Sequence, residues 1–328
     1  MWFRSIFLAL CVVGGPAVAA DLTTLRVNAF PTAKILPFLI GSSRGIFAKH
    51  GLSIDLQFTE NSTTQRESLA AGTADIVHSA VDNAVAMVET AGKDVVIVMG
   101  GDSGSNEFFV QSHIRSFADV RGHTLVVDAP DTAFALQAKK ILLNNGLKEG
   151  ADYSVKAIGR GAQRLQAMAD NREYAAAIMN PPFSVQAAKM GMKSLGRTVD
   201  LLGPYQAAGV FVMRSWARAN GPLLERYLAA YVESLRWAVD PAHRLECIAL
   251  LLSAKVLKLS QDEAESTYQL LLDSKIGYTR DAKLDPVGFA NTLALRAEFA
   301  SKPGSTAPAP DKYLDLSYYQ RALAVLGR

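Results

Sequence analysis

Polar side chains suited to holding a small molecule follow four predicted strands, where each strand gives way to a helix. They form four clusters, one after each strand: Asn28, Pro31 and Thr32; Asn61, Ser62, Thr63 and Thr64; Ser79, Asp82 and Asn83; and Asp128, Asp131 and Thr132. Each helix start offers unpaired backbone N–H groups and the positive end of a helix dipole, which suit an anionic group. Residues of these types also commonly serve as N-caps. Four clusters on one rim favour a binding site over capping alone.

Aromatic residues mark the same rim and could clamp the apolar or planar body of a molecule. They are Phe30, Phe134, Phe183 and Tyr205, each of which could equally belong to the core. Asp82 and Asp128 add negative charge at two of the helix starts. If either carboxylate points into the cleft, a molecule with an amine or N–H donors is favoured over a bare anion.

Patterns for catalysis and metal binding are sparse. No two histidines stand three or four residues apart, the spacing that places two metal ligands on one helical face; the five are His50, His78, His113, His123 and His243. The sequence has no G-x-S-x-G elbow, no phosphate-binding G-x-x-x-x-G-K-[ST] loop, and only two cysteines, Cys11 and Cys247. His78 could act as a base, but a buried, hydrogen-bonded histidine is favoured. The sequence therefore predicts a binding protein without catalytic residues, metal or cofactor.

The elements that must position these clusters alternate between short apolar strands and helices of 10 to 15 residues. This alternation is typical of an α/β protein with mostly parallel sheets. The strands of the first series are expected at 25–29, 52–58, 74–78 and 95–99, with helices at 36–50 and 82–91. A second series has strands at 124–127, 154–158 and 175–179 and helices at 133–144 and 163–170. Beyond a strand at 209–213 the pattern is helical, with an apolar stripe of Leu224, Tyr227, Leu228, Tyr231 and Leu235.

Two α/β series joined by two extended crossings indicate that the second is inserted into the first. The crossings are expected near 107–112 and 207–213, after a glycine-rich connection at 100–104. One lobe then comprises residues 21–111 and 208–328, with the C-terminal helices, and the other residues 112–207. Because open α/β sheets bind ligands at the carboxyl ends of their strands, the site is expected between the two lobes.

The N-terminus has the pattern of a secretory signal over residues 1–20. Arg4 precedes an apolar stretch at 6–13, and small residues at 17–20 allow cleavage before Ala20 or Asp21. The apolar stretch is too short to span a bilayer, and no second stretch approaches that length without a charge. The sequence predicts a periplasmic mature chain that does not span the membrane. With 34 basic and 31 acidic residues and no basic cluster, the chain is not expected to bind nucleic acid.

Several segments resemble periplasmic substrate-binding proteins of ABC importers, most closely the subgroup for nitrate, sulfonates, taurine and the pyrimidine precursor of thiamine. The segments are Leu25-Arg26-Val27, Leu36-Pro37-Phe38, 45–52 (GIFAKHGL), 69–76 (LAAGTADI), 117–122 (FADVRG) and Asn180-Pro181-Pro182-Phe183. The resemblance covers nearly the whole mature chain in order and spacing. It implies a type II periplasmic-binding-protein fold, in which two α/β lobes joined by two hinge crossings close on one small molecule. It also implies a monomer that delivers this molecule to a permease with its ATPase, without a reaction.

Transferring the family's pocket by position gives a candidate ligand-binding set. Its members are Asn28, Phe30, Thr32, Ser62, Thr63, Ser79, Asp82, Asn83, Asp128, Thr132 and Asn180, to which Phe183 is added from the rim. The sequence departs from the subgroup in two ways: no cleft arginine is evident, and the loop at 128–132 is acidic. Both departures argue against nitrate and simple alkyl sulfonates as ligands.

Two alternatives stay open at this point. Enzymes on the same fold include pyrimidine synthases and decarboxylases, which would need a cofactor lysine, a cysteine cluster or paired bases. A ligand-sensing protein without a role in transport would carry the same site.

Overall fold

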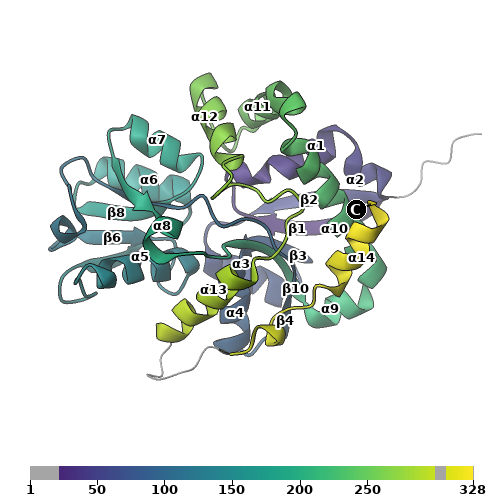
Figure 1. Cartoon of the computed structure of the whole chain (residues 1–328), viewed down its shortest axis with the longest axis horizontal. Helices are drawn as coiled ribbons and strands as arrows, with labels where there is room; N and C mark the ends of the chain where they lie inside the picture. The colour runs from purple at the N-terminus through teal and green to yellow at the C-terminus, as the bar shows by residue number, and fades with distance from the viewer. Residues whose placement is uncertain (1–21, 300–307, 328) are drawn as a thin grey trace, which may run out of the picture.

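The computed structural model describes residues 22–299 and 308–327, and these residues form two lobes, each built around one sheet (Figure 1). The first sheet has the strand order β2 (Leu52–Phe58), β1 (Thr23–Ala29), β3 (Ile76–Ala80), β10 (Ala208–Met213) and β4 (Val95–Met99). The second has the order β7 (Ser154–Ala157), β6 (Thr124–Val127), β8 (Tyr174–Met179), β5 (Glu107–Val110) and β9 (Lys193–Arg197). The predicted α/β class is confirmed. The predicted signal peptide, residues 1–20, lies outside the described residues.

Parallel pairing brings the ends of the central strands to one edge of each sheet. In the first sheet β1 runs parallel to both β2 and β3, so that Ala29 lies opposite Phe58 and His78. In the second sheet β6 runs parallel to β7 and β8. The strands that follow a crossing, β5 and β10, pair antiparallel with their neighbours. The polar clusters after the parallel strands therefore converge on one edge of each lobe.

The first crossing lies earlier than the sequence analysis predicted. Strand β5 pairs with β8 and β9, with Phe108 opposite Ile178, so residues 107–110 belong to the second sheet rather than to the first lobe. The chain crosses between Met99 and Glu107 and returns between Arg197 and Ala208. A short apolar strand such as 108–110 carries no local signal of the sheet it will join, because that choice depends on distant pairing partners.

Helices cover both sheets. Those of the first half are α1 (Leu36–Ser43), α2 (Ile46–Lys49), α3 (Ser62–Ala70) and α4 (Val81–Glu89), and those of the second lobe are α5 (Ala133–Asn144), α6 (Gly161–Asp170), α7 (Phe183–Lys189) and α8 (Thr198–Leu202). The C-terminal part adds α9 (Arg214–Ala219), α10 (Gly221–Ala238), α11 (Arg244–Ser253), α12 (Gln261–Leu271), α13 (Pro286–Glu298) and α14 (Ser317–Val325). Four short 3-10 helices are η1 (Ala33–Ile35), η2 (Phe117–Val120), η3 (Pro241–His243) and η4 (Pro310–Lys312). The helix expected at 36–50 is split into α1 and α2 by Gly45, whose φ of +66° few other residues adopt.

Helix α10 anchors the core of the first lobe. The five residues of its predicted apolar stripe are all buried, and the helix packs against α1 and α14. Gly41 allows α1 to pack closely against α10 and α2, because a Cβ at this position would overlap the Ser234 hydroxyl of α10 and the Phe47 ring of α2. Among the described residues, none of these helices is long and apolar enough to span a membrane.

Helix α13 spans the junction of the two lobes (Figure 1). Phe289 and Leu293 pack into the core beneath the first sheet, while Leu295 packs against Leu136 of helix α5 in the second lobe. Thr292 donates a hydrogen bond to the carbonyl of Gln206 in the second crossing at 3.2 Å. Helix α13 therefore braces the hinge from outside the cleft.

Candidate ligand-binding cleft

A cavity of about 120 Å³ lies between the two lobes. This is about ten times the ~10–15 Å³ that a single water needs, and so it suits a small organic molecule. Eight of the predicted site residues line it: Phe30, Thr32, Ser62, Ser79 and Asn83 from the first lobe, and Asp128, Thr132 and Asn180 from the second. Ser79 lies at the end of β3, and the others come from the loops and helix starts that follow β1, β2, β3, β6 and β8. The structure thus brings together most of the clusters that the sequence singles out.

At the start of α3, one residue caps the helix and its neighbour faces the cleft. The Asn61 side chain is the N-cap and accepts a hydrogen bond from the backbone N–H of Thr64 at 2.9 Å. Ser62, the first helical residue, is therefore free to direct its hydroxyl into the cleft. The predicted capping function and the predicted binding function are both present, on adjacent residues.

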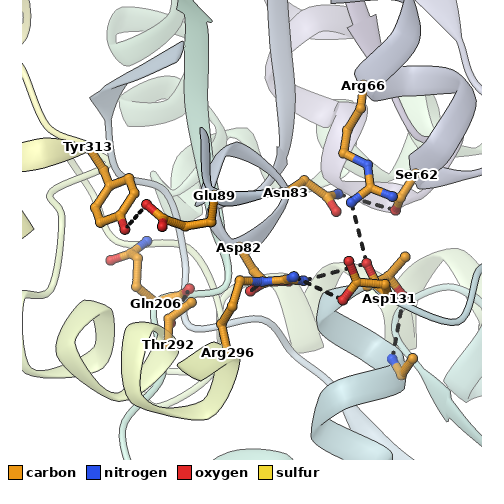
Figure 2. Close-up of polar contacts among 12 residues, drawn as sticks. Ser62, Arg66, Asp82, Asn83, Glu89, Asp131, Gln206, Thr292, Arg296 and Tyr313 are labelled. Atoms are coloured by element: carbon orange, nitrogen blue, oxygen red, sulfur yellow. Dashed lines mark hydrogen bonds and ion pairs between the residues drawn. The ribbon is translucent and has the colours of Figure 1, made fainter. Parts of the chain in front are cut away.

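A chain of hydrogen bonds crosses the cleft from the first lobe to the second. Asn83 Nδ2 donates to the hydroxyls of Ser62 and Ser79, both at 3.2 Å, and Figure 2 shows its bond to Ser62. Ser62 Oγ donates to Asp128 Oδ2 at 2.7 Å, and Thr132 Oγ1 donates to Asp128 Oδ1 at 2.6 Å. Because Ser62 and Asp128 belong to different lobes, the structure represents a closed arrangement of the cleft.

Two oppositely charged pairs of side chains belong to the lining. Lys34 Nζ donates to Asp102 Oδ1 at 2.6 Å, which ties the loop after β1 to the first crossing. The second cation is Arg164, in the first turns of helix α6, and Asp128 lies near enough to raise its pKa. Burial is the larger effect, and it lowers the pKa of the Arg164 guanidinium from its ordinary value. The lining therefore holds two cations and two carboxylates.

The expectation that the cleft has no arginine is wrong. Arg164 is buried in the lining, but its terminal nitrogens donate to the backbone carbonyls of Gly159 at 2.6 Å and Ile178 at 3.3 Å. The guanidinium carbon also lies 5.4 Å from the centre of the Phe134 ring. The sequence predicts the helix that carries Arg164, but not the face of that helix that meets the cavity.

Aromatic rings form the first-lobe wall of the cavity. Phe38, His78, Tyr231 and Tyr278 line it, and His78 Nε2 lies 2.6 Å from the hydroxyl of Tyr227. Burial lowers the pKa of His78 to about 3, so its ring is neutral at physiological pH. His78 is thus half-buried beside the cavity and hydrogen-bonded to Tyr227, which supports the interpretation of a structural histidine over a base.

Two predicted site residues on the first lobe have other partners. The Asn28 side-chain oxygen accepts a hydrogen bond from Gln65 Nε2 at 2.9 Å, which fastens α3 to β1. Asp82 is fully engaged with Arg296 and does not line the cavity, so the expectation that it holds an amine of the ligand is wrong. Arginine 296 lies 214 residues away in the sequence, and no local pattern links the two.

The remaining two predicted residues also lie outside the lining. Thr63 is exposed on the surface of α3. Phe183 packs into the core of the second lobe, where its ring covers Gly161. Of the other predicted rim aromatics, Tyr205 packs with Leu136 and Leu295 at the lobe junction. Bulky aromatic residues near a strand end are thus divided between core and cleft by the packing of each helix.

Several lining residues have no place in the sequence prediction. They are Lys34, Asp102, Asn106, Arg164, Tyr231 and Tyr278, together with small residues of the crossings. Asp102 lies within the glycine-rich stretch at 100–104 that the sequence analysis treats as a connection. Tyr231 belongs to the predicted apolar stripe, where its hydroxyl was the available signal for a second function. Among residues 22–299 and 308–327, no group of three or more His, Cys, Asp or Glu side chains is placed to hold a metal ion.

Solved structures with the same fold include two periplasmic binding proteins. A protein of Bordetella bronchiseptica RB50 superposes with a TM-score of 0.79 at 18% identity, covering 94% of this chain and 99% of that one. The periplasmic nitrate-binding protein of Synechocystis PCC 6803 gives a TM-score of 0.77 at 15% identity, covering 94% and 90%. The periplasmic aliphatic sulphonate binding protein of Escherichia coli gives 0.63 at 19% identity, covering 84% and 86%. These likenesses confirm the predicted periplasmic-binding-protein fold.

Sequence comparison points to the same group of proteins. A putative binding protein of Brucella abortus (strain 2308) is 21% identical over 249 residues, which cover 75% of this chain and 76% of the relative. The model of the NMT1-like family matches residues 18–252, well over half of the chain and most of both lobes. This chain is therefore a member of the NMT1-like family.

Proposed function

We propose that this protein is an exported, monomeric solute-binding receptor, which captures a small organic molecule between its lobes and delivers it to the permease of an ABC importer. The cavity between the lobes carries the proposal, because residues of both lobes line it and the Ser62–Asp128 hydrogen bond closes it. The nitrate-binding and sulphonate-binding proteins of the same fold, and a ligand-binding component of an ABC-type import system from Staphylococcus aureus, support it.

Closure would follow from the two crossings between the sheets. Rotation about 100–106 and 203–207 separates the segments that carry Ser62 and Asp128 and opens the cavity to solvent. A ligand that contacts both lobes favours the closed arrangement by its differential affinity for it. The closed form would then be the form that the permease recognises in the periplasm.

The cavity chemistry favours binding over conversion of the ligand. Its one histidine, His78, is held by the Tyr227 hydroxyl and is poorly suited to accept a proton because burial lowers its pKa to about 3. The carboxylate Asp128 accepts hydroxyl hydrogens from Ser62 and Thr132, and neither hydroxyl is hydrogen-bonded to a histidine or lysine that would make it a nucleophile.

The test is a thermal-melt screen of the chain from Asp21 onward against nitrate, organic sulfonates, carboxylates, amino acids, aromatic acids, amides, pyrimidines and polyamines. A ligand at about 100 times its Kd adds about 2.7 kcal/mol of stability, which raises the melting temperature by a few degrees. We expect one class to do so and to be recovered chemically unchanged. A ligand that is converted would support an enzyme, and binding without uptake through a reconstituted permease would support a sensor.

A further inference from the structure

We propose that the cavity selects an organic ligand without net charge that offers N–H or O–H donors to Asp128, and that it rejects small monoanions such as nitrate and alkanesulfonates. This inference rests on the proposed function and names the class of ligand. It follows from where the charges of the cavity lie and from what already occupies the helix ends.

The charged side chains of the lining cancel one another. Among the described residues that line the cavity, Lys34 and Arg164 are cationic and Asp102 and Asp128 are anionic. His78 adds no charge at neutral pH, because burial keeps its ring unprotonated. A ligand with net charge would enter a site of low dielectric constant with no spare counter-charge, and such burial is costly.

Both cations of the lining already have partners within the protein. Lys34 is paired with Asp102 at 2.6 Å, and the Asp102 side chain is almost fully buried. Arg164 donates one N–H from each terminal nitrogen to a backbone carbonyl, its buried Nε has no hydrogen-bond partner, and its guanidinium carbon lies 5.4 Å from the centre of the Phe134 ring. The charge of each cation is nevertheless balanced by a carboxylate of the same lining, Asp102 for Lys34 and the nearby Asp128 for Arg164.

The carboxylate of Asp128 occupies the position that an anionic ligand would take at the helix ends. Its Oδ2 accepts from the hydroxyl of Ser62 at 2.7 Å and lies 3.4 Å from the Ser62 backbone N–H, at the start of α3. Its Oδ1 accepts from Thr132, the N-cap of α5, at 2.6 Å. The positive ends of two helices are thus already neutralised by the protein's own carboxylate.

Asp128 keeps room for a donor from the ligand. Its side chain lies in the lining, and within the described part of the chain it forms no ion pair with a lysine or arginine nitrogen within 4 Å. A carboxylate offers about four acceptor positions, and the three donors named above leave one of them. An N–H or O–H group of the ligand would complete its hydrogen bonding, whereas a ligand anion would meet an uncompensated negative charge.

The experiment compares probes that are matched in size and differ in charge. Melting temperature and Kd are measured for the wild-type chain with benzamide, benzoate and benzylamine, and with taurine, ethanesulfonate and nitrate. We expect benzamide and taurine, which have no net charge at pH 7, to bind at least about tenfold more tightly than their charged partners. Native mass spectrometry of the freshly purified protein identifies any co-purified molecule, which should also have no net charge.

The variant Asp128→Asn removes the charge and keeps one acceptor oxygen. We expect the preference for benzamide over benzoate to shrink by about tenfold in this variant, with circular dichroism checking that it folds. Asp170→Asn is the matched control, since it makes the same charge change on the exposed end of α6 in the same lobe. The comparison in wild-type protein stands by itself if Asp128→Asn does not fold.

The possible results separate this inference from the proposed function. Tighter binding of nitrate, ethanesulfonate or benzoate than of the uncharged partners, or a charged co-purified ligand, would overturn the inference and leave the receptor function intact. If no probe shifts the melting temperature, the net charge of the co-purified molecule decides the inference: an uncharged molecule supports it and a charged one overturns it. If no probe binds and no molecule is retained, the receptor function fails and the inference fails with it.

Discussion

Arg296 holds Asp82 through two hydrogen bonds, from Nε to Oδ1 at 2.5 Å and from Nη2 to Oδ2 at 2.6 Å. Both side chains are buried, with exposed fractions of 9% and 1%. The same guanidinium reaches Asp131 of the second lobe, from Nη1 to Oδ1 at 2.9 Å. Burial by itself lowers the pKa of Arg296, but the two carboxylates raise it above its ordinary value. One arginine on α13 therefore links α4 to the loop that carries the cleft residues Asp128 and Thr132.

Removing the link between lobes should weaken closure without weakening the fold. In Asp131→Asn the buried Asp82–Arg296 pair persists, while the more exposed pair is lost. Because the Asp131 side chain is 51% exposed, solvent screening limits its pair with Arg296 to about 0.2–1 kcal/mol. We expect the Kd of a bound solute to rise up to about fivefold, as measured by calorimetry, and the melting temperature of the unliganded protein to change little. Asp170→Asn serves as the control, and an unchanged Kd in Asp131→Asn would rule out a contribution of this pair to closure.

Breaking the buried pair should be far more costly. Arg296→Met leaves the Asp82 carboxylate buried without a partner, which typically costs about 3–5 kcal/mol. Urea denaturation should therefore show a loss of stability of that order. The double variant Asp82→Leu with Arg296→Met should recover most of it, because no buried charge is left unpaired. A single variant as stable as the wild type would contradict the buried geometry of this pair.

Acidification should destabilise the unliganded protein through His78. Its ring packs between Phe38, Tyr227 and Tyr231, and burial lowers its pKa from 6.5 to about 3. Between these two values the unfolded chain binds a proton that the folded chain does not, so stability falls as the pH drops below 6.5. At pH 4.5 the expected loss is about 2–3 kcal/mol.

The measurement is urea denaturation of the wild type and of His78→Gln at pH 7 and pH 4.5. Glutamine keeps a polar group near the Tyr227 hydroxyl and cannot titrate in this range. The wild type should lose about 2–3 kcal/mol more than the variant on acidification. Equal losses in both proteins would show that other groups carry the acid sensitivity.

Phe183 should matter for packing and not for ligand contact. A Cβ added at Gly161, which lies in the cavity lining, would overlap the Phe183 ring. Gly161→Ala should therefore cost about 1–3 kcal/mol, and Phe183→Leu in the same chain should restore part of that loss because leucine is smaller. Phe183→Leu alone should lower the melting temperature and leave the Kd for a solute unchanged. A large increase in the Kd of Phe183→Leu would instead show that Phe183 contributes to ligand binding.

The sequence by itself determined the alternation of strands and helices and the convergence of polar residues at the strand ends. Both are local in origin: hydrophobic periodicity defines each element, and parallel pairing brings the carboxyl ends of strands together. Ser62, Asn83, Asp128 and Thr132 line the cavity because each follows directly on such a strand or starts its helix. The buried stripe of α10 follows from the same periodicity.

Only the tertiary structure decided which of these groups are available to a ligand. Asp82 and Asp128 look alike in the sequence, but Asp82 meets Arg296 from a helix 214 residues away, while Asp128 meets two hydroxyls at the cleft. The same holds for Arg164, whose partners are carbonyls, and for β5, whose sheet is set by distant strands. Charge pairing and sheet membership depend on contacts between segments far apart in the chain, and no local pattern of residues encodes them.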